Sequence, residues 1–253
     1  MGGVVSLKGG TFPNDQDWII TTSGLGFAVG LETFGKDHLT SVTPKWTQPL
    51  PLDLHARSRL WWGLDRQDVA RNWSDRLIYG VSLSSLAWGP LLAENSEQAF
   101  FINASVFSAN SIVTNLIKIV SSRERPYAHF QSRPPQGPRD NTSFISGHAS
   151  VAFSQALSNA MILSQRYPDQ DRLIWTSLLG SAGLTAYLRV AGDMHYISDI
   201  LAGSVVGILI GWTLTNHFLN EGAEQEAGEG AALRGVSPHP ASNMLFMIKI
   251  PLG

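Results

Sequence analysis

Hydrophobic residues gather into six long segments along the chain, and shorter polar stretches separate them. The segments cover approximately residues 18–34, 77–93, 99–120, 147–165, 173–190 and 197–219. Each is close to the length of about 17–25 residues that a helix needs to cross a bilayer. The pattern predicts an all-α fold, a membrane-embedded bundle of about six apolar helices.

The last segment carries this pattern most clearly. Residues 200–219, "ILAGSVVGILIGWTLTNHFL", contain no Asp, Glu, Lys or Arg. Gly203, Gly207 and Gly211 recur every four residues, which places them along one side of a helix. Small residues in that arrangement let two helix backbones approach closely in lipid, so we expect this helix to pack tightly against another.

Overall composition agrees with a membrane protein without requiring one. Charged residues make up 15% of the chain, against about 25% in typical soluble domains. Residues 99–120 contain three asparagines, however, and the mean hydropathy is +0.01, so a soluble helical bundle is the alternative. A net charge of -2 argues against a general nucleic-acid binder. The chain has no cysteine, which excludes disulfides and thiolate metal sites.

Polar stretches set the expected domain limits. We expect an N-terminal tail at 1–17, a helical domain at 18–219 with its core motifs within 100–215, and a flexible Gly/Ala/Glu-rich tail at 220–253. Residues 55–76, "HARSRLWWGLDRQDVARNWSDR", alternate charge with tryptophan, which suits either an amphipathic helix at a membrane interface or a solvated surface helix. Ser74 and Asp75 are predicted to cap the second apolar helix.

Two charged clusters flank the segments at 99–120 and 147–165. Lys118 and Arg125 are seven residues apart and project from nearly the same helix face, before Pro126 ends the helix. Ser146 and Gly147 precede the next helix, so their backbone N–H groups form a candidate anion site helped by the helix dipole. His148 follows directly, where it could donate a proton.

A third cluster, "YLRVAGDMHYISD", lies between the last two segments. Arg189 ends one helix, and His195 and Asp199 begin the next, four residues apart and on the same face. An acid beside a histidine fixes its tautomer and leaves the other ring nitrogen free. If successive helices run up and down, all three clusters meet at one end of the bundle, where three cations, free helix N–H groups and two histidines suit a phosphate.

This arrangement resembles the three-part signature of the type 2 phosphatidic acid phosphatase and vanadium haloperoxidase superfamily. The matching residues are Lys118-x6-Arg125-Pro126, then Ser146-Gly147-His148, then Arg189-x5-His195-x3-Asp199. Order and internal spacing agree in all three parts, over about residues 100–215. Ile145 stands where the family usually has Pro, and Leu188 where it usually has Ser.

The resemblance implies a phosphatase that acts through a phosphohistidine. His195 would be the nucleophile, Asp199 would support it, and His148 would protonate the leaving oxygen and then activate water. The phosphate oxygens would be held by Lys118, Arg125, Arg189, Ser146 and Gly147. No metal or other cofactor is expected, and vanadate is expected to inhibit.

Other functions and substrates stay open on these residues. A vanadate-dependent haloperoxidase would use the same pocket with His195 as the metal ligand, although members of that branch are typically far longer. A non-catalytic membrane scaffold that binds phospholipid is the third possibility. The expected substrate is a phosphorylated lipid or polyprenyl, or a small phosphomonoester. We expect a bacterial inner-membrane protein with its site facing the periplasm, with a soluble periplasmic form as the alternative. The positive-inside rule counts against that orientation, because several cations lie on the site's side.

Overall fold

The computed structural model describes residues 12–233, and every regular element in that range is a helix. The long helices are α1 (Asp15–Gly30), α4 (Gln67–Leu83), α6 (Ser96–Ser121), α8 (Gly147–Arg166), α9 (Asp171–Ala191) and α10 (Ile197–Leu233). Short α-helices are α2 (Lys36–His38), α3 (Pro51–Leu60), α5 (Gly89–Leu92) and α7 (Pro126–His129). Two π-helical turns, η1 (Leu31–Gly35) and η2 (Ser84–Trp88), and two 3-10 turns, η3 (Gly137–Asn141) and η4 (Pro168–Gln170), complete the elements. The all-α prediction is confirmed.

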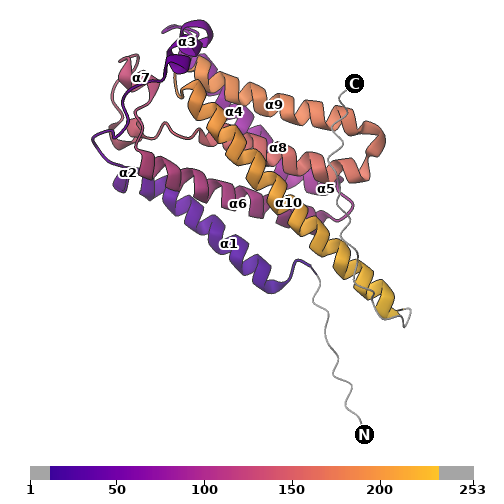
Figure 1. Cartoon of the computed structure of the whole chain (residues 1–253). Coiled ribbons are helices and arrows are strands. Elements are labelled where there is room, and N and C mark those ends of the chain that lie inside the picture. The colour runs from indigo at the N-terminus through magenta and orange to yellow at the C-terminus, as the bar shows by residue number, and fades with distance from the viewer. Residues whose placement is uncertain (1–11, 234–253) are drawn as a thin grey trace.

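Consecutive long helices run antiparallel to one another, so their ends gather at two opposite poles of the bundle (Figure 1). The end of α6, the start of α8, the end of α9 and the start of α10 share one pole, and α3 and α7 lie over it. This pole brings together the three charged clusters of the sequence. The start of α1 and the end of α10 lie toward the other pole (Figure 1).

Helix limits differ from the sequence prediction at several places. α1 begins at Asp15, inside the predicted N-terminal tail at 1–17. α4 begins at Gln67, so Ser74 and Asp75 lie inside the helix and cap nothing. α10 continues to Leu233, well past the predicted end at 219, because its "EGAEQEAGEGAAL" extension is rich in Ala and Glu, which are strong helix formers. The remaining predicted tails, 1–11 and 234–253, lie outside the described residues.

α10 packs against α8 through its glycine stripe, as the sequence predicted. A Cβ atom added at Gly203, Gly207 or Gly211 would lie 2.5, 2.2 or 2.7 Å from the carbonyl oxygens of the α8 segment, at Ser146, Ser150 and Ser154 respectively. Side chains larger than hydrogen therefore do not fit, and the two backbones touch. This contact fixes the start of α10 against the start of α8.

Buried amides add polar contacts between α6, α8 and η2. Asn103 Nδ2 donates to the carbonyl of Ser85 and to Asn159 Oδ1, and Ser158 Oγ donates to Asn103 Oδ1. Hydrogen bonds of this kind hold helices together where apolar surroundings offer no competing water. They explain why α6 carries asparagines inside an otherwise apolar segment.

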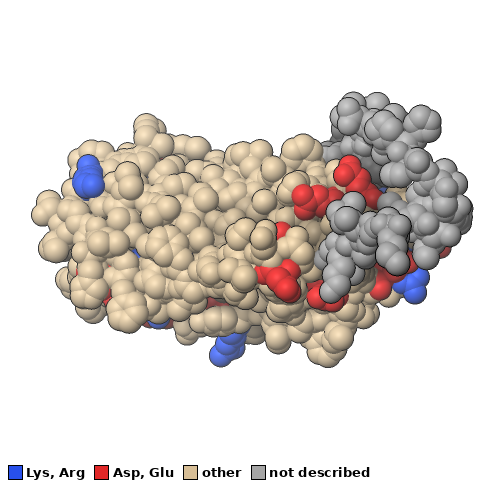
Figure 2. Space-filling model, turned by 90° about the horizontal axis from the view of Figure 1, so that it is seen from below, with Lys and Arg blue, Asp and Glu red and all other residues tan. Residues whose placement is uncertain are grey.

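The outside of the bundle is largely apolar. α10 turns Leu201, Val205, Leu209 and Trp212 outward, each more than 40% exposed, on the face opposite its glycines. Figure 2 shows a face with few Lys or Arg, on which Asp and Glu gather toward one end. Two described helices, α6 and the part of α10 up to Gln225, are long and apolar enough to cross a membrane. Exposed apolar surface of this kind is typical of a face that contacts a membrane or another protein.

Candidate active site

Three buried cations meet at the pole that the sequence predicted. Lys118 ends α6, Arg125 precedes α7 and Arg189 ends α9, and their exposed fractions are 3%, 9% and 3%. Lys118 lies beside the start of α8, where a Cβ on Gly147 would be 3.5 Å from its Cε. Buried charges normally have a counter-charge, so the partners of these three decide what the site can bind.

Two of the cations are held by neutral oxygens. Lys118 Nζ donates to the carbonyl of Thr142 at 2.8 Å, and Arg125 donates to the carbonyls of Arg139 and Met194 and to Thr142 Oγ1. Among the described residues, neither forms an ion pair with a carboxylate. These contacts orient the two side chains without neutralising them, which leaves positive charge for an anionic ligand.

Only some of the hydrogen-bond donors of the Arg189 guanidinium have an acceptor. Its Nη1 donates to Ser74 Oγ at 2.9 Å and to Asp75 Oδ1 at 2.8 Å. Its buried Nε has no acceptor among the described residues. Because a buried donor without an acceptor costs free energy, an anion that accepts from this Nε would be stabilised.

His195 presents one free ring nitrogen to the cations. Its side chain is 2% exposed, and Nδ1 lies 2.8 Å from the carbonyl oxygen of Ser143. A carbonyl can only accept, so Nδ1 carries the proton, and Nε2 in the neutral ring keeps its lone pair. The tautomer required of a nucleophile is therefore set by the backbone of Ser143.

Asp199 plays a different part from the one expected. Its Oδ2 is 3.8 Å from His195 Nδ1, too far for a hydrogen bond. Its carboxylate instead accepts from Arg123, the Ser143 hydroxyl and the Tyr196 N–H. Asp199 thus anchors the loop that holds His195 and adds a negative charge near its ring.

Arg123 is a site residue that the sequence analysis did not identify. It is 1% exposed, pairs with Asp199 and with Asp53 of α3, and lies between the rings of Trp46 and Tyr196 at 3.8 and 4.3 Å from their centroids. It connects α3 to the start of α10. No spacing rule distinguishes it from the neighbouring charges in "SSRERP".

Burial lowers the pKa of His195 well below its ordinary value, and the charges of Lys118, Arg125 and Arg189 lower it further. These three cations therefore lie close enough to the ring to influence its charge. The imidazole is consequently neutral at ordinary pH and available to attack an electrophile.

The start of α8 supplies N–H donors, but not all of those expected. The N–H of Ser146 donates to the carbonyl of Asp199 at 3.0 Å, and its hydroxyl accepts from the N–H of Ala149 as the helix cap. Ser146 therefore holds the two helix starts together rather than offering its N–H to an anion. Gly147 and His148 carry the remaining N–H groups of the first turn.

Comparison with known proteins agrees with this geometry. Residues 99–222 match the PAP2 superfamily, a stretch that contains every motif residue from Lys118 to Asp199. The chain belongs to the PAP2 superfamily.

Two known proteins are similar to this chain, one in sequence and one in fold. The chain is 35% identical over 79 residues to lipid A 1-phosphatase from Porphyromonas gingivalis, a match that covers 30% of this chain and 16% of that protein. Its fold is similar to that of a transmembrane PAP2-type phosphatidylglycerolphosphate phosphatase from Bacillus subtilis, with a TM-score of 0.50 and 15% identity, over 79% of this chain and 94% of the other.

The two departures from the PAP2 pattern lie beside the motif residues and are both buried. Ile145 is 1% exposed, and Leu188 packs with Ala70 and Ala191 in a small core between α4 and α9. Leu188 thus fills the core next to Arg189 with an apolar side chain where the family usually has a hydroxyl.

Two further charged residues of the motif segments form contacts with neighbouring short helices. Asp193 forms a bidentate pair with Arg57 of α3 and accepts from Ser132. Glu124, the neighbour of Arg125 in the sequence, contacts His129 at 3.0 Å. These two contacts hold α3 and α7 at this pole of the bundle.

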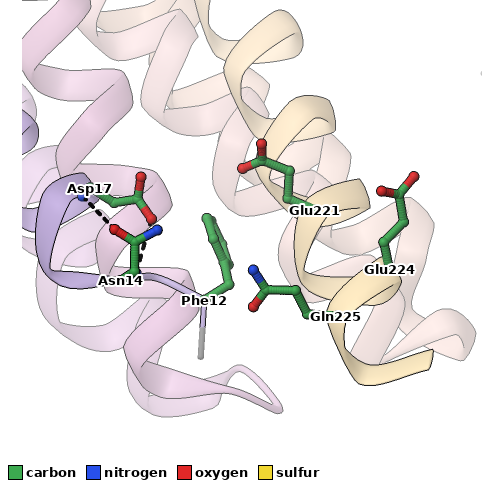
Figure 3. A pocket seen from close by; sticks show the side chains of 6 residues that line it. All are labelled: Phe12, Asn14, Asp17, Glu221, Glu224 and Gln225. Carbon is green, nitrogen blue, oxygen red and sulfur yellow. Dashed lines mark hydrogen bonds between the residues drawn. The ribbon is translucent and has the colours of Figure 1, made fainter. Parts of the chain in front are cut away.

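A separate pocket of about 350 Å³ lies at the opposite pole, between the start of α1 and the end of α10 (Figure 3). Asp17, Glu221 and Glu224 line it, and Asp17 is already engaged by the N–H of Asn14. Its acidic lining would repel a phosphate. Within residues 12–233, no three His, Asp or Glu side chains come together as a metal site.

Proposed function

We propose that this protein is a phosphatase that hydrolyses a phosphomonoester or diphosphate of a lipid or polyprenyl through a phosphohistidine. One observation carries the proposal: His195 has its free nitrogen fixed by a backbone carbonyl and lies among buried cations, two of which have no carboxylate partner within the described residues. Such a site binds an anion and presents a nucleophile to it.

In the first step, His195 Nε2 attacks phosphorus while the bond to the leaving oxygen breaks. His148, which takes up a second proton when the anionic phosphate group binds beside it, gives that proton to the leaving oxygen and becomes neutral. Lys118, Arg125 and Arg189 stabilise the charge on the phosphoryl oxygens, together with the N–H groups of α8. Asp199, 3.8 Å from Nδ1, stabilises the positive charge that forms on the His195 ring.

In the second step, water attacks the phosphohistidine. Neutral His148 takes a proton from the water as the new P–O bond forms and the N–P bond breaks. His195 returns to its neutral form, inorganic phosphate leaves, and His148 is again protonated for the next turnover. Atoms and charges balance on these two histidines without a metal, so we propose a metal-independent reaction.

A membrane lipid fits the placement of this site. The site lies at the pole of a bundle whose sides expose apolar residues, so the phosphate of a lipid could reach it while the acyl chain stays in the bilayer. Both relatives are named for phosphorylated lipid substrates and come from bacteria. We therefore propose an integral protein of the bacterial inner membrane, with the site on the periplasmic side.

The test is to trap the intermediate. Purified protein in detergent is mixed with ³²P-labelled phosphatidic acid, lipid diphosphate or p-nitrophenyl phosphate and quenched in alkali, because phosphohistidine is acid-labile. We expect labelled protein and released phosphate, and neither with His195→Gln. His217→Gln, which changes an exposed histidine at the other pole, is the matched control and should behave as wild type.

Three results would contradict the proposal. Phosphate release by His195→Gln would exclude the covalent route. Loss of activity in EDTA, restored by a divalent ion, would show that a metal is required. Bromide oxidation by peroxide that depends on added vanadate, without phosphate release, would instead identify a haloperoxidase.

A further inference from the structure

Asp75 touches two residues of the site from outside the family motifs. It lies in the middle of α4, and its Oδ1 accepts from His148 Nε2 at 2.9 Å and from Arg189 Nη1 at 2.8 Å. α4 precedes the stretch at 99–222 that matches the PAP2 superfamily. The carboxylate therefore contacts the proposed proton donor and one phosphate-binding cation at the same time.

The contact with Asp75 determines which nitrogen of His148 can move a proton. An ionised carboxylate only accepts hydrogen bonds, so Nε2 must keep its hydrogen in both forms of the ring. Nδ1 is then the nitrogen that is protonated in the acid form and bare in the base form. Both proposed steps use that single nitrogen, once to donate and once to accept.

The negative charge of Asp75 also offsets the positive charge of the cations around His148. Arg189 shares the same carboxylate oxygen, and Lys118 lies beside Gly147, the preceding residue; Arg71 of α4 lies 3.9 Å from the other carboxylate oxygen. Positive neighbours disfavour a protonated imidazole, whereas a hydrogen-bonded carboxylate favours it.

We propose that Asp75 is a positioning residue that makes His148 a competent acid and base, and that also holds Arg189 in place. This inference rests on the proposed phosphatase function. Ser74 separates the two roles, because its hydroxyl accepts from Arg189 Nη1 at 2.9 Å and does not contact His148. A change at Ser74 therefore perturbs Arg189 alone, while a change at Asp75 perturbs both.

The experiment measures formation and hydrolysis of the phosphoenzyme separately by rapid alkaline quench, using an alkyl phosphate and p-nitrophenyl phosphate. In Asp75→Asn, formation from the alkyl phosphate should slow about 10²-fold or more, the usual contribution of general acid catalysis. Formation from p-nitrophenyl phosphate should slow much less, because nitrophenolate leaves without a proton. Hydrolysis of the phosphoenzyme should slow, so that labelled protein accumulates.

Matched variants identify the cause. Ser74→Ala should slow phosphoenzyme formation from both substrates by the same factor. Asp75→Glu should recover part of the rate with the alkyl phosphate. Asp65→Asn, which changes an exposed acid before α4, should have the same rates as wild type. Equal slowing of formation for both substrates in Asp75→Asn would overturn the proposal, as would no slowing. Absence of a phosphoenzyme in wild type would instead overturn the proposed function itself.

Discussion

At the scale of single residues, the site depends on which oxygens hold its charges. Lys118, Arg125 and His195 are positioned by carbonyl or hydroxyl oxygens, which fix direction and leave charge or lone pair for the substrate. The motif residues could be predicted from the sequence because each is a charged, histidine, serine or glycine residue at a fixed spacing. The Ser143 carbonyl could not, since any residue has one, and Asp75 could not, since its role depends on packing between distant helices.

The buried, neutral state of His195 predicts how stability depends on pH. The pKa of His195 is lowered in the folded protein, so between that value and the ordinary value of about 6.5 the unfolded chain binds more protons than the folded one. Stability therefore rises with pH in this window and is lost as pH falls below about 6.5, by at most about 1.4 kcal/mol per pH unit for this group.

Thermal unfolding in detergent at pH 7.5 and pH 5 tests this sign. Wild type should lose more stability on acidification than His195→Gln, which has no group to protonate at that position. An equal loss in both proteins would show that the pKa of His195 does not change on folding, which would contradict this prediction.

At the scale of elements, one face of α10 packs against α8 and the opposite face is exposed. Its glycines contact the backbone of α8, and its large apolar side chains face outward. The spacing of four made both faces predictable from the sequence. The π-helical turns η1 and η2 could not be predicted, because nothing in their residue pattern distinguishes them from a continuous helix.

Gly207→Ala should separate α8 from α10. The added Cβ would lie 2.2 Å from the carbonyl oxygen of Ser150, and neither backbone can move without disturbing α8, whose first turn carries His148. We expect a loss of about 1–3 kcal/mol of stability, as for other overpacked sites, and a lower kcat. Gly180→Ala is the matched control, because nothing lies within 4 Å of its added Cβ.

Thermal unfolding and turnover are measured on both glycine variants in the same detergent. Gly180→Ala should be neutral or slightly stabilising, since alanine favours the helix. If Gly207→Ala were as stable and active as this control, the close backbone contact between α8 and α10 would not exist in solution.

At the scale of the whole molecule, the position of the site at one pole was predictable from the alternation of the segments, whereas its orientation in a membrane was not. The positive-inside rule counts charges in loops, but the cations near this pole are used by the structure. Arg123 pairs with Asp53 and Asp199, Arg133 with Asp68, and Arg139 with Asp37. They therefore carry little information about which side of the membrane the pole occupies.

Orientation can be measured directly because the chain has no cysteine. Gln136→Cys places one thiol at an exposed position beside the site, and Asp169→Cys places one in η4 at the opposite pole. With a membrane-impermeant maleimide on intact spheroplasts, we expect Gln136→Cys to be labelled at once and Asp169→Cys only after permeabilisation, because we propose that the site faces the periplasm. The reverse pattern would place the site in the cytoplasm, and immediate labelling of both thiols would show that the bundle does not cross the membrane.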